Sequence, residues 1–204
     1  GKNVLELGCG TGELANGLAL CGANVYAIDF SSSSIKKAKE LSKKLGTKVK
    51  FEEKNILEFK SEKKYDVVIA LGSLHHTINA KKGFENGISC LKKDGLIVIG
   101  LYNKYSRFRQ RVRRLILGIF CGKNIEKRIE IGKRLFGAME SREQEADKYG
   151  QVWESYHSVS EILRWFSKNN IDFIASKPKF EKPLIDEIKW FLSKKGAFFV
   201  MVGK

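Results

Sequence analysis

The stretch Val4–Gly12, with the sequence Val-Leu-Glu-Leu-Gly-Cys-Gly-Thr-Gly, holds the most informative local pattern of this 204-residue chain. A short apolar strand breaks there into three glycines at alternate positions and then into a helix. Glycine at Gly8, Gly10 and Gly12 permits positive φ and lets a ligand approach the backbone without meeting a Cβ atom. Amides at the start of the helix face whatever is bound. The stretch therefore predicts a turn that cradles a nucleotide-like ligand.

The spacing of these glycines excludes two common phosphate-binding patterns. A dinucleotide fingerprint needs glycine at the first, third and sixth positions, and counted from Gly8 the sixth residue is Glu13. A carboxylate there would repel a pyrophosphate. No Gly-Lys-Ser or Gly-Lys-Thr follows the strand, so a P-loop is excluded as well.

A second strand is predicted over 24–29, where β-branched and apolar residues end in a carboxylate. Asp29 lies about 20 residues after the first glycine, the usual reach to a ribose diol. Its two acceptor oxygens can hold both ribose hydroxyls. The alternative is that Asp29 caps the helix expected over 32–45, but serines at 31–34 can do this instead.

The rest of the chain continues the alternation of strands and helices. A third strand runs from Val49 and Phe51 toward Asn55, a fourth covers 65–71, a helix is expected over 80–91, and a fifth strand covers 96–102. Two last strands are expected over 171–175 and 197–202, after a capped helix over 158–166. This alternation predicts right-handed crossovers and a parallel sheet.

The glycine run, the strand-end carboxylate and the Leu-His-His segment after the fourth strand resemble class I S-adenosylmethionine-dependent methyltransferases of the small-molecule type (methyltransferase type 11-like). The resemblance implies S-adenosyl-L-methionine (AdoMet) as the cofactor. Asn55 stands where the family commonly has Asp; its amide oxygen can bond the adenine amino group, and the alternative is an Asn that makes a turn. The implied cofactor-binding residues are Glu6, Gly8, Cys9, Gly10, Gly12, Asp29, Phe30, Asn55, Ile56 and Leu71.

The same resemblance implies an α/β fold, the Rossmann-like class I methyltransferase sandwich. Its seven-stranded sheet is mostly parallel, has the order 3-2-1-4-5-7-6, and ends in an antiparallel strand. Residues 1–204 would form a single domain, and residues 104–157 a helical insert after the fifth strand that acts as a lid or a substrate-recognition segment. We expect a further segment to precede Gly1, because the chain starts directly at the first strand.

The predicted insert carries much of the chain's charge. Residues 104–134 hold eleven Lys and Arg against two Glu, or 11 − 2 = +9, out of +15 for the whole chain. Apolar residues at helical spacing, from Phe108 to Ile119, predict a basic amphipathic helix. One interpretation is a lid helix that packs its apolar face on the domain; the others are contact with an anionic substrate, a membrane surface or RNA. Neither nucleic acid nor membrane is favoured.

Methyl transfer chiefly requires alignment of the acceptor and exclusion of water, with a base needed only for protonated nucleophiles. His75 and His76 are the candidate bases because imidazole takes up a proton near neutral pH. The alternative is that this pair shapes the loop beside the cofactor. Tyr102, Asn103 and His157 are candidates for substrate contact.

The leading hypothesis is an enzyme that methylates a small-molecule acceptor, with O-methylation slightly ahead of N- or C-methylation. The alternatives are an RNA methyltransferase that uses the basic insert and a non-catalytic AdoMet-binding module. Four cysteines without C-x-x-C spacing indicate neither a disulfide framework nor a zinc site, and no other metal is expected. This cysteine pattern predicts a reduced cytoplasmic compartment. No apolar run approaches the ~20 residues needed to span a bilayer.

Overall fold

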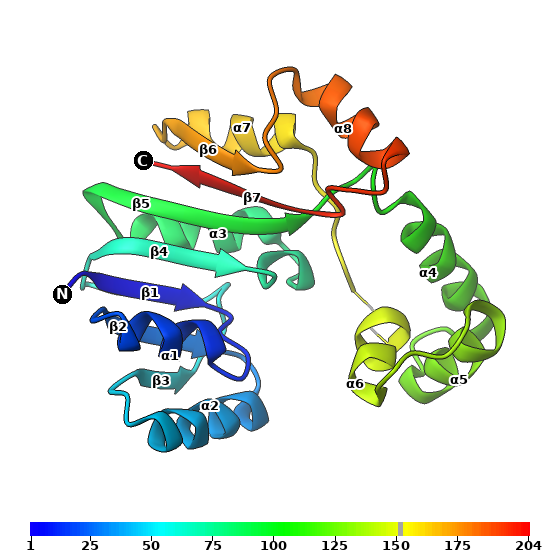
Figure 1. Ribbon diagram of the computed structural model, residues 1–204, viewed down its shortest axis with the longest axis horizontal. Coiled ribbons are helices and arrows are strands. Elements are labelled where there is room, and N and C mark those ends of the chain that lie inside the picture. The colour runs from blue at the N-terminus through cyan, green and yellow to red at the C-terminus, as the bar shows by residue number, and fades with distance from the viewer. Residues whose placement is uncertain (151–152) are drawn as a thin grey trace.

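A single mixed sheet organises the chain in a computed structural model, which describes residues 1–150 and 153–204 (Figure 1). Its strand order, β3-β2-β1-β4-β5-β7-β6, is the predicted one, and β7 runs antiparallel to both of its neighbours. The strands are β1 (Asn3–Leu7), β2 (Asn24–Asp29), β3 (Lys50–Glu53), β4 (Tyr65–Leu71), β5 (Leu91–Tyr102), β6 (Phe173–Lys177) and β7 (Phe198–Gly203).

Helices cover both faces of this sheet because its strands alternate apolar residues between the two sides. Val4 packs with the layer formed by α1 and α2, whereas Leu5 packs with the layer formed by α3, α7 and α8. The helices of the domain are α1 (Glu13–Leu20), α2 (Ser32–Leu45), η1 (Leu74–His76), α3 (Ala80–Ser89), α7 (Val159–Lys168) and α8 (Pro183–Leu192).

The crossover helix α2 begins and ends where the sequence predicts. The Ser31 side chain accepts a hydrogen bond from the Ser34 amide and so caps it. The helix expected over 80–91 ends earlier, at Ser89, because Leu91 already pairs with Tyr65. Pairing then resumes between Leu96 and Val67, so residues 92–95 form a bulge in a longer strand rather than a separate turn.

The insert leaves the sheet at the carboxyl ends of the parallel strands, on the right of Figure 1. It contains α4 (Phe108–Cys121), α5 (Ile125–Phe136), α6 (Arg142–Glu145) and η2 (Ala146–Gly150). It has a small core of its own, made of Leu117, Cys121, Ile129 and Tyr149. Residues 151–152, which belong to the predicted insert 104–157, lie outside the described residues.

Of the interpretations of the basic helix, the one in which its apolar face packs on the domain is wrong. Helix α4 forms where predicted, but it packs on α5 through Leu117 and Cys121, while the apolar positions used to predict it are mostly exposed. Leu115 is 66% and Ile119 is 71% exposed. Arg114, in contrast, is largely buried, because it forms an ion pair with the buried carboxylate of Glu154.

Candidate functional site

The glycine turn between β1 and α1 has the backbone conformation that its sequence predicts. Gly8, Gly10 and Gly12 have φ values of 78°, 53° and 83°. A Cβ atom on Gly8 would lie 2.2 Å from the Cβ of Ser73, whose hydroxyl donates to the Leu7 carbonyl at 2.6 Å. A Cβ atom on Gly10 would meet no protein atom within 4 Å. Gly8 therefore permits close packing of the turn against β4, whereas Gly10 faces open space.

A cavity of ≈ 670 Å³ opens beside this turn, at the carboxyl ends of β1 and β4 where the strand order reverses. This volume is in the range of small-molecule and cofactor sites. From the sequence-predicted residues it brings together Gly8, Gly10, Asp29, Phe30, Asn55, Ile56 and His76. The other lining residues, which the sequence analysis does not single out, are Ser31, Leu57, Gly72, Ser73, Thr77 and Ile78.

Asp29 ties the second strand to the glycine turn. Its Oδ2 accepts a hydrogen bond from the Gly10 amide at 2.8 Å, and its Oδ1 accepts one from the Ser31 amide at 2.9 Å. Ser31, not Asp29, caps α2, so the alternative role considered for Asp29 belongs to its neighbour. A carboxylate has about four acceptor positions. Asp29 therefore keeps the capacity to accept two hydroxyl groups from the cavity side.

Glu6 lies beneath the turn and carries a strongly perturbed carboxyl group. The residue is buried, and its Oε2 has no hydrogen-bond partner among the described residues. Burial, followed by repulsion from Glu13 and Asp29, raises the pKa of Glu6 to about 8. The side chain does not line the cavity. It is a neutral acid beneath the turn at neutral pH, and a cationic group nearby would favour its ionised form.

Asn55 and Ile56 lie at the edge of the cavity after β3. The Asn55 Oδ1 accepts a hydrogen bond from the Leu57 amide at 3.0 Å, and its Nδ2 donates to Glu58 at 3.1 Å. This is the turn-forming arrangement that was the alternative interpretation of Asn55. Asn55, Ile56 and Leu57 thus line the cavity together with Phe30, whose side chain is exposed.

The two histidines on η1 differ in their access to the cavity. His76 lines it, whereas His75 is fully buried. The His75 ring packs in tilted contacts between the rings of His76 and Tyr102, at centroid distances of 4.3 Å and 3.8 Å. Burial, then the neighbouring cationic groups, lowers the pKa of His75 to about 2. His75 is therefore a neutral packing ring, and of the two histidines only His76 is exposed to a ligand in the cavity.

Two ion-paired arginines pack behind this aromatic cluster. The Arg107 guanidinium lies 3.4 Å from the centroid of the Tyr102 ring. Arg107 and Arg114 both pair with Glu154, whose side chain is only 2% exposed. This charge cluster (Arg107, Arg114, Glu154) therefore ties α4 and the residue before it to the segment 153–157 of the insert, and Arg107 joins the cluster to Tyr102 at the end of β5.

The segment 153–157 crosses the strand ends and holds this edge together. The Trp153 indole donates to the Thr77 carbonyl at 2.8 Å, and the Ser155 amide donates to the His75 carbonyl at 2.8 Å. The His157 amide donates to the Tyr102 carbonyl at 2.9 Å. The His157 ring is buried and is engaged on both nitrogens, by Ser155 and Glu161.

Asn103, another candidate for substrate contact, is fully buried. Its Nδ2 donates to Glu187 on α8 at 2.6 Å, and its Oδ1 accepts from the Tyr105 and Ser106 amides. Glu187 also accepts the Val159 amide at 2.9 Å. These bonds give Asn103 a structural role, because it joins the end of β5 to α7 and α8.

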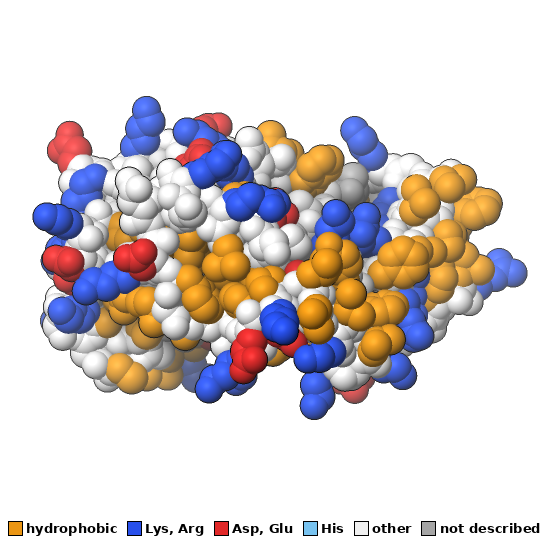
Figure 2. Space-filling model, turned by 90° about the horizontal axis from the view of Figure 1, so that it is seen from above, with side chains coloured by type: hydrophobic (Ala, Val, Ile, Leu, Met, Phe, Trp, Pro, Cys, Tyr) orange, Lys and Arg blue, Asp and Glu red, His pale blue; other side chains and the backbone are white. Residues whose placement is uncertain are grey.

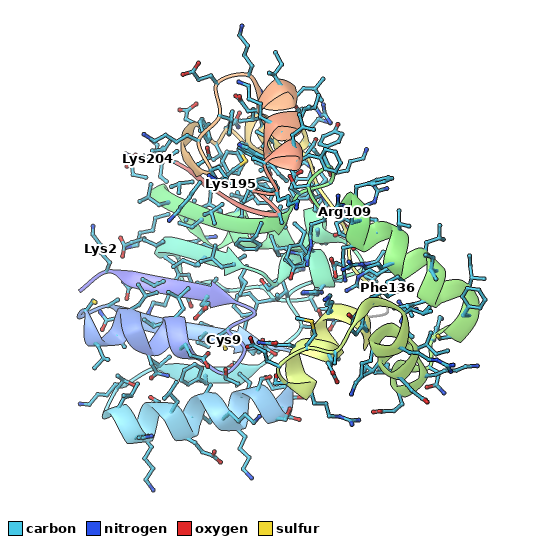
Figure 3. All side chains as sticks on the ribbon, turned by 45° about the vertical axis from the view of Figure 1, so that its right-hand side comes forward. Lys2, Cys9, Arg109, Phe136, Lys195 and Lys204 are labelled. Atoms are coloured by element: carbon cyan, nitrogen blue, oxygen red, sulfur yellow. The ribbon has the colours of Figure 1, made fainter. Side chains whose placement is uncertain are left out.

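Cys9 lies inside the turn at the carboxyl end of β1, and the insert helices that carry Arg109 and Phe136 extend from the same edge of the sheet (Figure 3). Burial, then the carboxylates of Glu6 and Asp29, raises the pKa of the Cys9 thiol to about 12. Gly12 lies in the same turn, and Leu71 ends β4; neither lines the cavity. In the part of the chain that the structure describes, no three metal-ligating side chains lie together and no helix is long and apolar enough to cross a membrane.

This fold and cavity define a class I methyltransferase domain. A family model described as "Methyltransferase domain" matches residues 1–170. The chain therefore belongs to this family of S-adenosylmethionine-dependent methyltransferases, as the sequence resemblance predicted.

The chain is also similar to curated proteins named ubiquinone biosynthesis O-methyltransferase. That of Rickettsia canadensis is 36% identical over 104 residues, which is 51% of this chain and 44% of the relative. That of Rickettsia felis is 38% identical over 101 residues, which is 50% of this chain and 41% of the relative. The matched region thus spans less than half the length of these relatives.

Solved structures share the fold at low sequence identity. PKMT2 from Rickettsia typhi has a TM-score of 0.71 at 14% identity and is matched over 98% of this chain and 48% of that chain. Magnesium protoporphyrin IX methyltransferase from Synechocystis PCC 6803, solved with bound SAH, has a TM-score of 0.63 at 17% identity, over 100% of this chain and 73% of that chain. These likenesses show the fold alone.

Proposed function

We propose that this chain binds AdoMet in the cavity beside the glycine turn and methylates a small-molecule acceptor, with an oxygen atom as the favoured acceptor atom. The observation that carries the proposal is that Asp29 and His76 line the same cavity. Asp29 is held there by a hydrogen bond from the Gly10 amide. Similarity to proteins named O-methyltransferases supports the choice of oxygen.

The residues present fit AdoMet. The free acceptor positions of Asp29 suit the two ribose hydroxyls, and the segment of Asn55, Ile56 and Leu57 with Phe30 offers an apolar site for the adenine. The unpartnered Glu6 oxygen suits the cationic character of the cofactor. When bound, AdoMet supplies an electrophilic methyl group. The carboxylates of Asp29 and Glu13 beside the turn disfavour a phosphate-bearing ligand.

His76 has two roles in this proposal. For a hydroxyl acceptor it takes the proton released as the oxygen–carbon bond forms and the sulfur–carbon bond breaks. It also closes the acceptor side of the cavity together with Thr77 and Ile78. His75 and Tyr102 position His76. The His75 ring packs against the rings of His76 and Tyr102, and the Arg107 guanidinium covers the Tyr102 ring.

Residues 104–157 are proposed as the acceptor-side cover of this single domain. Their arginines at 107 and 114 are paired with Glu154, which argues that the anchored part of the insert shapes the site rather than binding a polyanion. The structure offers no RNA-recognition module among its described elements. Four free cysteines support a reducing, cytoplasmic location.

The function is tested by methyl transfer from radiolabelled AdoMet to a panel of phenols, catechols, hydroxy acids and amines, with His76→Ala as the matched variant. We expect labelled product from a hydroxyl-bearing acceptor and ~100-fold or greater loss in His76→Ala. Binding of AdoMet without transfer to any acceptor would indicate the non-catalytic module instead. Transfer to RNA alone would replace the small molecule as substrate.

A further inference from the structure

Helices α4 and α8 present apolar side chains to solvent on one face of the molecule. Figure 2 shows hydrophobic side chains gathered over the region where Figure 1 places these two helices, with Lys and Arg at the margins. Leu192 on α8 is 72% exposed, similar to Ile119 on α4. We call this the α4–α8 surface, and it consists of Phe108, Val112, Leu115, Ile119, Phe120, Leu184, Ile185, Ile188 and Leu192.

So many large apolar side chains on one face indicate a docking surface. The folded chain has other helices whose apolar side chains are covered by the sheet, such as α7, where Ile162 and Phe166 are buried. Helix α4 differs because its buried residues are Gln110, Leu117 and Cys121, which pack within the insert, and because Arg114 is held by its ion pair with Glu154. Its apolar face is therefore left for something outside the described chain.

The charge around the α4–α8 surface favours an anionic occupant. Residues 104–136 carry eleven Lys and Arg against two Glu. Exposed Arg109 and Arg111 lie on α4, and exposed Lys189, Lys194 and Lys195 lie on or next to α8. A second copy of this chain, with a net charge of +15, would bring the same basic groups together. An apolar surface with basic margins instead matches an anionic lipid headgroup region.

We propose that the α4–α8 surface docks on an anionic phospholipid bilayer. The apolar side chains enter the boundary between headgroups and acyl chains, and the arginines and lysines at the margins reach the headgroup phosphates through their flexible stems. The helices lie on the bilayer and do not cross it. This inference is independent of the methyl acceptor and of the cofactor.

The test is sedimentation of the purified chain with vesicles of phosphatidylcholine alone and of phosphatidylcholine mixed with phosphatidylglycerol. We expect binding to the mixed vesicles, weak binding to phosphatidylcholine, and weaker binding as salt is added. The double variant Leu115→Glu with Ile119→Glu should lower the partition coefficient for mixed vesicles at least ~10-fold, because it removes two apolar anchors and adds two like charges.

The matched control is Leu20→Glu with Leu45→Glu, which makes the same charge change at exposed leucines on α1 and α2. Its partition coefficient for mixed vesicles should stay within about twofold of that of the parent chain. Two added negative charges change the total charge of the many basic groups only slightly. AdoMet affinity reports folding of both variants.

Failure of the parent chain to bind mixed vesicles at low salt would overturn the proposal. Equal losses in the two double variants would do so as well. Sedimentation velocity gives the third contrary outcome: a dimer that dissociates on Leu115→Glu with Ile119→Glu would assign the surface to a second copy.

Discussion

Replacement of Gly8 by alanine separates the packing role of the glycine turn from its ligand-binding role. The residue has a φ of 78°, where a Cβ atom costs ~1–2 kcal/mol. The added Cβ would also lie 2.2 Å from the Cβ of Ser73, and relief of such overpacking costs ~1–3 kcal/mol. Ser73 cannot move away freely, because its hydroxyl donates to the Leu7 carbonyl. Gly8→Ala should therefore lower the free energy of unfolding by ~2–5 kcal/mol.

Gly10→Ala is the matched variant, since its Cβ would meet no protein atom within 4 Å and its φ of 53° is in the left-handed region. It should cost only the ~1–2 kcal/mol of the backbone conformation, without the overpacking term. Because Gly10 lines the cavity, the same change should weaken AdoMet binding ~10-fold or more. Urea unfolding measures the first quantity, and calorimetry the second. Equal stability of Gly8→Ala and the parent chain, or unchanged AdoMet affinity in Gly10→Ala, would refute the reasoning.

Three further variants test other parts of the site. The pKa of Glu6 is raised to about 8, so between pH 5 and 8 the folded chain retains a proton that the unfolded chain releases. The free energy of unfolding should therefore fall by up to ~4 kcal/mol from pH 5 to 8. Glu6→Gln should remove this pH dependence when the two proteins are compared by urea unfolding at each pH. Asn103→Ala should lower the free energy of unfolding by ~1–3 kcal/mol while the acceptor KM stays within about twofold, and a large rise in KM would restore Asn103 as a substrate contact. Glu154→Gln should destabilise the chain by ~3 kcal/mol and speed proteolysis within the insert, because Arg107 and Arg114 lose their carboxylate; a proteolysis pattern like the parent's would show that the cluster does not anchor the insert.

The sequence predicted those features that depend on local pattern and on strand order. Positive φ at the three glycines follows from residue type, and the carboxylate that ends β2 must lie beside the turn once β1 and β2 pair in parallel. The same reasoning could have placed Gly72 and Ser73 at the cavity. They follow β4, which pairs with β1 at the reversal of strand order, and ligands bind at such a point in open α/β sheets.

The sequence could not predict features that depend on contacts between distant residues. The amphipathic pattern of α4 is real, but the pattern does not tell which face turns inward. That is set by the pairing of Arg114 with Glu154, in a different part of the insert. Similarly, Asn103 was a candidate for substrate contact, yet its side-chain amide donates to Glu187, 84 residues further along the chain. Helices α5 and α8 were not predicted either.

Calorimetric titration of AdoMet into the parent chain and into Asp29→Ala tests most directly the claim that this cavity binds the cofactor through its ribose. The account predicts saturable binding at one site in the parent chain and at least ~100-fold weaker binding in Asp29→Ala, because two charge-assisted hydrogen bonds to the ribose are lost. Asp29 also bonds the Gly10 and Ser31 amides, so unfolding measurements on the same samples report whether the turn persists. Equal affinity in the two proteins would contradict the assignment of the site.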